Sequence, residues 1–148
     1  MSMSKPVLKF ILGASPLHSW SIDLAALILR ASFGALMLLN HGISKWNRLF
    51  SQEFGNFPDP LGVGIHNSLA LTVFAEVLGA LLLVVGLFTR FSAALMAFTM
   101  LIAAFYVHWE DPFKEKEHAL LFFLASVCTY LIGAGKYSLD YYFEKKQA

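Results

Sequence analysis

The sequence predicts an all-α integral membrane protein, with four transmembrane helices packed as one bundle in a single domain over residues 1–148. Of its residues, 57% are hydrophobic and only 14% are charged, whereas a soluble domain is about 45–50% apolar and about 25% charged. The apolar residues also gather in four runs, each near the 20 or so residues that a helix needs to cross a bilayer. These observations exclude a water-soluble monomer and a disordered chain.

The four predicted crossings follow one another with short connections. They extend over residues 24–46, 68–88, 92–109 and 118–134. Before them, residues 1–21 are expected to lie on the membrane surface, because the apolar stretch ahead of Ser15-Pro16 is too short for a signal peptide. Glycine and proline separate the crossings, most densely in the connection between the first two. No separate soluble domain fits into the remaining chain.

Positive charge predicts the orientation of the chain. With four crossings, both termini and the 88–91 turn share one side and carry six Lys and Arg residues, against four on the other side. We therefore expect the inner membrane of a bacterium, with both termini and the 136–148 tail in the cytoplasm. The net charge of +1 offers no basic field for nucleic acid. A lone cysteine, Cys128, excludes an internal disulfide and a cysteine-based zinc site.

Two ionisable residues lie inside the predicted crossings, where a charge costs at least about 2.5–3.5 kcal/mol and normally has a partner. Arg30 lies about two turns into the first crossing, and Glu76 lies near the middle of the second. Because these helices run antiparallel, a rise of about 1.5 Å per residue puts both side chains within roughly 6 Å of the same depth. We therefore predict an Arg30–Glu76 pair, which either ties the helices together or handles protons.

Further polar residues gather at the non-cytoplasmic ends of the crossings. One face of the first crossing carries Arg30, Gly34, Met37, His41 and Lys45. A stripe of small residues on the third crossing ends in His108, and Glu117 begins the fourth crossing. These positions predict a mouth lined by His41, His108 and Glu117, with Arg30 and Glu76 beneath it.

Each histidine at this mouth has a second interpretation, because helix ends at the headgroup level collect His, Trp and Lys without any function. The inward stripes favour a functional role for His41 and His108, whereas His66 and His118 fit the headgroup level. No metal site is predicted, because histidine ligands would have to converge from different helices.

Four short motifs follow one another along the chain. They are His41-Gly42-x-x-Lys45, Phe74-Ala75-Glu76, Gly86 to Arg90 (GLFTR) and Gly133 to Asp140 (GAGKYSLD). Together they resemble the DoxX family of small bacterial membrane proteins, over about residues 24–140. Carried over by position, the matching polar residues are His41, Lys45, Glu76, Arg90, His108 and Glu117.

The resemblance implies a four-helix bundle in the cytoplasmic membrane that is associated with redox work. Some relatives look like subunits of thiosulfate:quinone oxidoreductase, and others are linked to oxidative-stress complexes with superoxide dismutase and a sulfurtransferase. Because such activities can belong to partner subunits, the resemblance leaves open whether this chain is itself an enzyme.

Two main hypotheses follow. In the first, the chain is a membrane redox component that takes a quinone or a small sulfur compound, with Glu76, His108 and His41 exchanging protons and Arg30, Lys45 and Glu117 binding substrate. In the second, it is a non-enzymatic scaffold that anchors partner membrane or soluble redox proteins. A small-solute transporter is a third hypothesis, and it would need a homodimer to complete a pathway.

Overall fold

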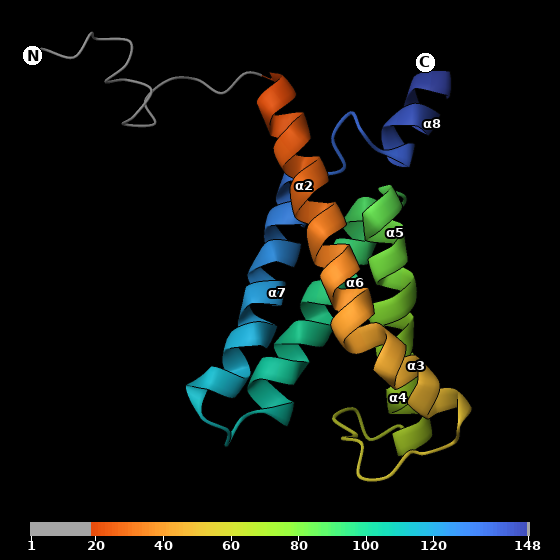
Figure 1. Cartoon of the computed structure of the whole chain (residues 1–148), viewed down its shortest axis with the longest axis vertical. Helices are drawn as coiled ribbons and strands as arrows, with labels where there is room; N and C mark the ends of the chain where they lie inside the picture. Colours follow the sequence, from red (N-terminus) through yellow and green to blue (C-terminus); the bar gives the residue numbers. More distant parts are fainter. Residues whose placement is uncertain (1–18, 148) are drawn as a thin grey trace, which may run out of the picture.

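The computed structural model describes residues 19–147, and every regular element in this range is a helix (Figure 1). The first long helix comprises α2 (Ser19–Met37), η1 (Leu38–Gly42) and α3 (Ile43–Phe50). The second comprises α4 (Ile65–Val73), η2 (Phe74–Gly79) and α5 (Ala80–Val85), and the third comprises α6 (Thr89–Ile102) and η3 (Ala103–Val107). They are followed by α7 (Phe113–Ile132) and the short α8 (Leu139–Gln147).

Three of the long helices are apolar and long enough to cross a membrane. They are Ser19–Phe50, Ile65–Val85 and Thr89–Val107, and they overlap the first three expected crossings with shifts of a few residues. The helix α7 overlaps the expected fourth crossing, but four consecutive charged residues, 114–117, lie in its first turns. Of the expected surface segment 1–21, the first 18 residues lie outside the described part of the chain, and residues 19–21 begin α2.

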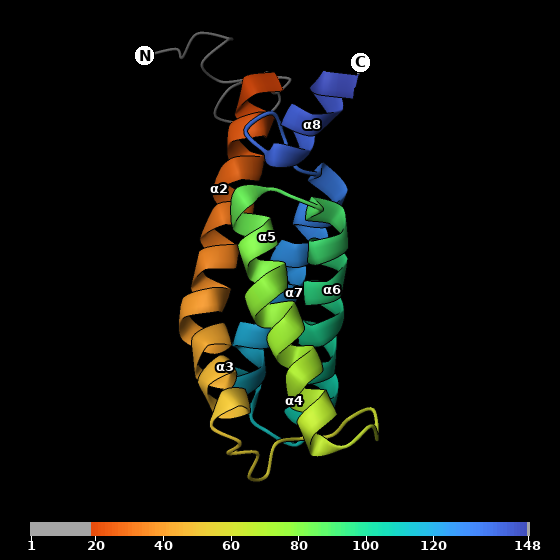
Figure 2. The same cartoon turned by 90° about the vertical axis from the view of Figure 1, so that its right-hand side faces the viewer.

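The long helices pack side by side with alternating direction (Figures 1 and 2). The start of α2, the α5–α6 turn and α8 lie at one end, here called the α8 end. The 51–64 loop and the α6–α7 turn lie at the opposite end, here called the loop end. The described helices thus follow the predicted alternation of the crossings.

Alanine, methionine and leucine side chains fill the interior, and aromatic and other bulky side chains face outward. The core cluster is made of Met37, Ala80, Leu83, Ala93, Met96, Met100, Ala104 and Ala119. Bulky side chains such as Phe98 and Leu131 are more than half exposed, which suits a surface in contact with lipid chains. Gly34 and Gly42 let the first two helices approach closely, because a Cβ on either residue would lie 2.8 Å from a carbonyl oxygen of the second helix.

The guanidinium of Arg30 binds backbone carbonyls at the α8 end, and the predicted Arg30–Glu76 pair is wrong. Nη1 donates to the carbonyl oxygens of Leu83 at 3.0 Å and Val84 at 2.7 Å, at the C-terminus of α5. Nε donates to Ala134 O at 3.2 Å, and Nη2 donates to Tyr137 O. Arg30 contacts the second helix at Leu83 and Val84, which lie about seven residues, or about 10 Å, beyond Glu76 on that helix. The last carbonyls of a helix need donors from outside it, and Arg30 supplies them.

The α8 end is closed by further contacts between segments that are distant in sequence. Gly86, with φ of +71°, ends α5 where an added Cβ would lie only 2.7 Å from the Arg30 guanidinium carbon. The carboxylate of Asp140 in α8 accepts hydrogen bonds from the backbone N–H groups of Phe88 and Thr89 at 2.8 and 2.9 Å. Asp140 therefore caps the N-terminus of α6, where a negative charge is favoured.

Candidate functional site

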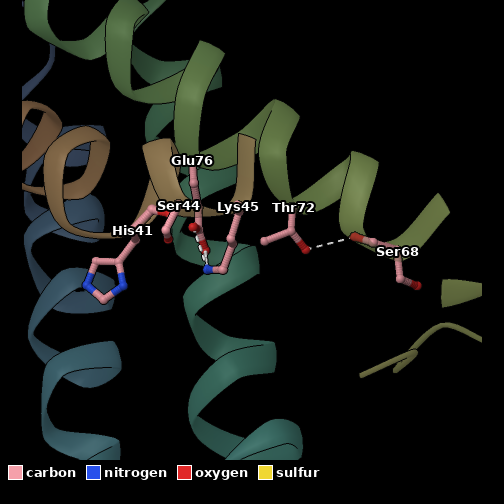
Figure 3. Close-up of polar contacts among 6 residues, drawn as sticks. All are labelled: His41, Ser44, Lys45, Ser68, Thr72 and Glu76. Carbon is pink, nitrogen blue, oxygen red and sulfur yellow. Dashed lines mark hydrogen bonds and ion pairs between the residues drawn. The ribbon is translucent and has the colours of Figure 1, made fainter. Parts of the chain in front are cut away.

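A buried ion pair between Lys45 and Glu76 lies in the loop-end half of the molecule (Figure 3). Nζ of Lys45 is 2.6 Å from Oε1 and 2.5 Å from Oε2 of Glu76. The Glu76 side chain is 2% exposed and that of Lys45 is 26% exposed, so the lysine is the partner that reaches open space. A carboxylate buried this completely requires such a partner, because removing a charge from water costs several kcal/mol.

Two π-helical segments set the geometry of this pair. Gly42 ends η1, where an added Cβ would lie 2.8 Å from Glu76 O and 3.1 Å from Val77 Cγ2, so η1 and η2 lie in close contact. Each segment widens the helix locally, and such π-bulges are frequent at functional sites. Lys45 follows one turn later on α3 and reaches back to the carboxylate.

The pair lies on the wall of a pocket of about 570 Å³. Apolar side chains from the second and third helices form most of this wall, including Leu71, Phe74, Leu95, Phe98, Ile102 and Val107. Ser68, Thr72 and Thr99 also line it. The volume is in the range of small-molecule and cofactor sites, which are mostly apolar with a few placed polar groups.

His108 lies at the edge of the pocket, where η3 ends. Its Nδ1 is 2.6 Å from Oδ2 of Asp111, and both side chains are more than one third exposed. A carboxylate at this distance orients the imidazole. The pocket therefore has two charged or chargeable pairs, one buried and one accessible to water.

Residues 57–61, here called the lid, line the pocket from the loop end. Asp59 holds the lid to α4: its carboxylate accepts hydrogen bonds from Ser68 Oγ at 2.5 Å and from the N–H groups of Val63 and Gly64 at 3.1 and 2.8 Å. The hydrogen bond from Ser68, aided by those backbone N–H groups, holds the pKa of Asp59 below its usual range. Asp59 is thus anchored as a carboxylate.

Arg48 attaches the lid from the other side. Its guanidinium donates to the carbonyl oxygens of Glu53, at 2.7 Å, and Phe54, and its carbon lies 5.5 Å from the centre of the Phe57 ring. Arg48 also lines the pocket. Arg48 and Ser68 therefore each connect the lid with the wall of the pocket.

The structure brings together three of the six predicted site residues. Glu76, Lys45 and His108 line the pocket, whereas Arg30, His41 and Glu117 do not. Arg30 lies at the α8 end, and Glu117 is exposed on the first turns of α7. His41 packs edge-on against Phe122 of α7, with ring centres 5.7 Å apart, and points away from the Lys45–Glu76 pair (Figure 3). The predicted mouth, as a single group of these residues, is therefore wrong.

The π-helical segment η1 explains the position of His41. On an uninterrupted α-helix His41 continues the face of Arg30, Gly34 and Met37. Here the buried residues run through Met37 and then Gly42, a spacing of five residues, so His41 turns toward α7. Periodicity alone cannot detect such an inserted residue.

Sequence reasoning also missed the residues that hold the lid, Arg48 and Asp59. Both have a signal in the sequence: Arg48 is three residues after Lys45 on one helical face, and Asp59 lies between two prolines shortly before a helix. Within residues 19–147, no group of three or more His, Cys, Asp or Glu side chains lies close enough together to hold a metal ion.

Comparison with known proteins gives one match. No curated protein and no solved structure matches the chain. The model of the DoxX family matches residues 25–109, more than half of the chain. This segment includes most of the first long helix, the second and third long helices, the Lys45–Glu76 pair and the residues that line the pocket, and the match confirms the resemblance seen in the motifs. The chain is therefore a multi-pass membrane protein in contact with the lipid bilayer, and it belongs to the DoxX family.

Proposed function

We propose that this protein binds a membrane-soluble quinone in the pocket and exchanges protons with it during a redox reaction. The observation that carries this proposal is the Lys45–Glu76 ion pair on the wall of an otherwise apolar pocket. A quinone has the matching chemistry, because its ring and tail are apolar and its two carbonyl oxygens accept hydrogen bonds. Lys45 Nζ, which has donors beyond those facing Glu76, supplies one such bond.

The proposed reaction balances with a partner redox protein as the source of electrons. Reduction of a quinone to a quinol takes two electrons from that partner and two protons from this chain. Lys45 passes one proton to a carbonyl oxygen, and protonated His108 passes the second. Glu76 holds the Lys45 side chain at the wall of the pocket, and Asp111 orients the imidazole of His108. Water at the loop end then returns both protons.

We further propose that α7 is a fourth crossing. The apolar part of α7 is long enough to accompany α6, against which it packs, across most of the bilayer. Its charged first turns then lie at the headgroup level, where Lys and Glu are tolerated. The bias of positive charge supports a position in the inner membrane of a bacterium, with the α8 end in the cytoplasm and the loop end outside.

The experiment uses the full chain in phosphatidylcholine nanodiscs. Saturable quenching of tryptophan fluorescence by decyl-ubiquinone measures binding. We expect Lys45→Met and Glu76→Gln each to weaken binding at least fivefold. Lys114→Met, which removes an equal charge from an exposed position on α7, leaves binding unchanged.

Two results would contradict the proposal. One is the absence of saturable binding in the wild-type protein. The other is an affinity of Lys45→Met and Glu76→Gln equal to that of the control Lys114→Met. Either result would favour the scaffold hypothesis, in which the inward polar residues serve the stability of the fold alone.

A further inference from the structure

We infer that the pocket receives its occupant from the bilayer, through a gap between α4 and α6, while the lid separates it from water. The inference deepens the proposed function and rests on it for the identity of the head group. It defines the substrate class independently of that identity: a molecule dissolved in the membrane, with a polar head and an apolar body.

The gap arises because the second and third helices separate toward the loop end. The helix α6 packs against α5 and η2, whereas α4 packs against α3. The pocket occupies the space that this separation leaves between α4 and α6. Figure 1 shows the two helices apart at the loop end.

Exposed apolar side chains border this gap. Leu71 on α4, Phe74 on η2 and Phe98 on α6 all line the pocket, and they are 52%, 45% and 55% exposed. Side chains that both line a pocket and face outward show that the pocket is open on that side. These residues lie well inside the membrane-spanning helices Ile65–Val85 and Thr89–Val107, so the opening faces lipid chains and not water.

The lid closes the other direction of access. Between Phe57 and Leu61 it covers the pocket at the loop end, and it is fixed by Asp59 on one side and Arg48 on the other. The buried carboxylate of Glu76 lies below this cover, whereas His108 at the edge of the pocket remains accessible to water. A water-soluble solute would have to displace the lid, whereas a lipophilic molecule reaches Glu76 and Lys45 from the side.

Carbene footprinting with two related diazirines tests this direction of access without any quinone. Trifluoromethyl-phenyl-diazirine dissolves in the bilayer, and its carboxylate derivative stays in water. With the full chain in phosphatidylcholine nanodiscs, we expect the lipid-soluble reagent to label Leu95 and Ile102, which are half-buried in the pocket wall. Met96, which is 2% exposed in the core, is the control that stays unlabelled.

The carboxylate reagent should label the exposed Leu61 in the wild-type protein but not Leu95 or Ile102. In Asp59→Ala, which frees the lid, the same reagent should label all three. Labelling of Leu95 and Ile102 from water in the wild type, or labelling from the lipid no stronger than at Met96, would overturn the inference.

Addition of decyl-ubiquinone then separates this inference from the proposed function. Protection of Leu95 and Ile102 from the lipid-soluble reagent supports both. If the quinone gives no protection while the labelling pattern stands, the pocket opens to the bilayer as inferred, and the quinone is the wrong occupant.

Discussion

At the scale of single residues, two buried charges in the membrane-spanning helices have different partners and different tasks. Glu76 pairs with the amine of Lys45 beside the pocket, and Arg30 binds backbone carbonyls at the α8 end. The sequence correctly predicted that both lie in the interior, because a charge on the lipid-facing side of a membrane helix is costly. It could not predict the partners, because these depend on helix register.

Removal of Lys45 is expected to destabilise the fold. Lys45→Met leaves the Glu76 carboxylate buried without a partner, at a cost of about 3–5 kcal/mol. The double variant Lys45→Met/Glu76→Met replaces the pair with apolar side chains and should recover most of that loss. Unfolding by SDS in mixed detergent micelles measures both, and a double variant no more stable than the single one would contradict this account.

Replacement of Arg30 by lysine is expected to cost about 2 kcal/mol or more. Lysine keeps the charge but lacks the planar set of donors that reaches four carbonyl oxygens in two segments, α5 and the 133–138 connection. The matched control is Arg90→Lys, at an exposed position, for which a change within about 0.5 kcal/mol is expected. The same SDS titration compares the two variants, and equal stabilities would show that the geometry of the guanidinium is unimportant.

At the scale of elements, the π-helical segments decide which side chains reach the pocket. The segment η1 turns His41 toward α7, and η2 contains Glu76. The predicted helix bounds were accurate to within about five residues, because apolar length and helix-breaking residues determine them. The helical faces were less accurate, because one inserted residue rotates everything after it by about 100°.

The close approach of η1 and η2 should not tolerate an added methyl group at Gly42. Gly42→Ala puts a Cβ 2.8 Å from Glu76 O, and we expect a loss of about 1–3 kcal/mol from overpacking. Gly79→Ala is the control, because its Cβ would meet Leu95 Cδ2 at an ordinary 3.9 Å. Thermal unfolding in detergent compares the variants. Equal melting temperatures of the two variants would mean that η1 and η2 can move apart to accept the methyl group without a loss of stability.

The lid should be released in acid. Because the pKa of Asp59 is lowered in the folded protein, its stabilising contribution is present above its unfolded pKa, about 3.9, and is lost as the pH falls through the folded value. The amide proton shifts of Val63 and Gly64 in detergent micelles should titrate with a midpoint below about 3.9. Asp59→Asn should abolish this titration, and a midpoint at or above about 3.9 in the wild type would contradict the assignment.

At the scale of the whole molecule, the protein has alanine, methionine and leucine inside and many large apolar residues outside. The composition predicted this membrane class directly, because the chain has too few polar residues to cover a water-facing surface. The pocket could not be predicted in the same way. It depends on the separation of α4 from α6, and this separation is determined by contacts between segments that are distant in the sequence.

The topology predicts that the two ends of the molecule lie on opposite sides of the membrane. A reporter that is active only in the cytoplasm should work when fused after α8 and fail when inserted in the 51–64 loop. The excess of Lys and Arg at the α8 end predicts that this end faces the cytoplasm. Activity at both sites, or at the loop alone, would contradict the proposed orientation or the fourth crossing.

The position of Arg30 also has a consequence for how the protein is made. Two of its four carbonyl acceptors belong to Ala134 and Tyr137, which follow it by 104 and 107 residues. When the first helix leaves the ribosome and enters the membrane, these acceptors have not yet been synthesised. The newborn chain therefore carries a cation that lacks half of its partners until the last part of the chain is made, so assembly of the α8 end is completed only when translation is nearly finished.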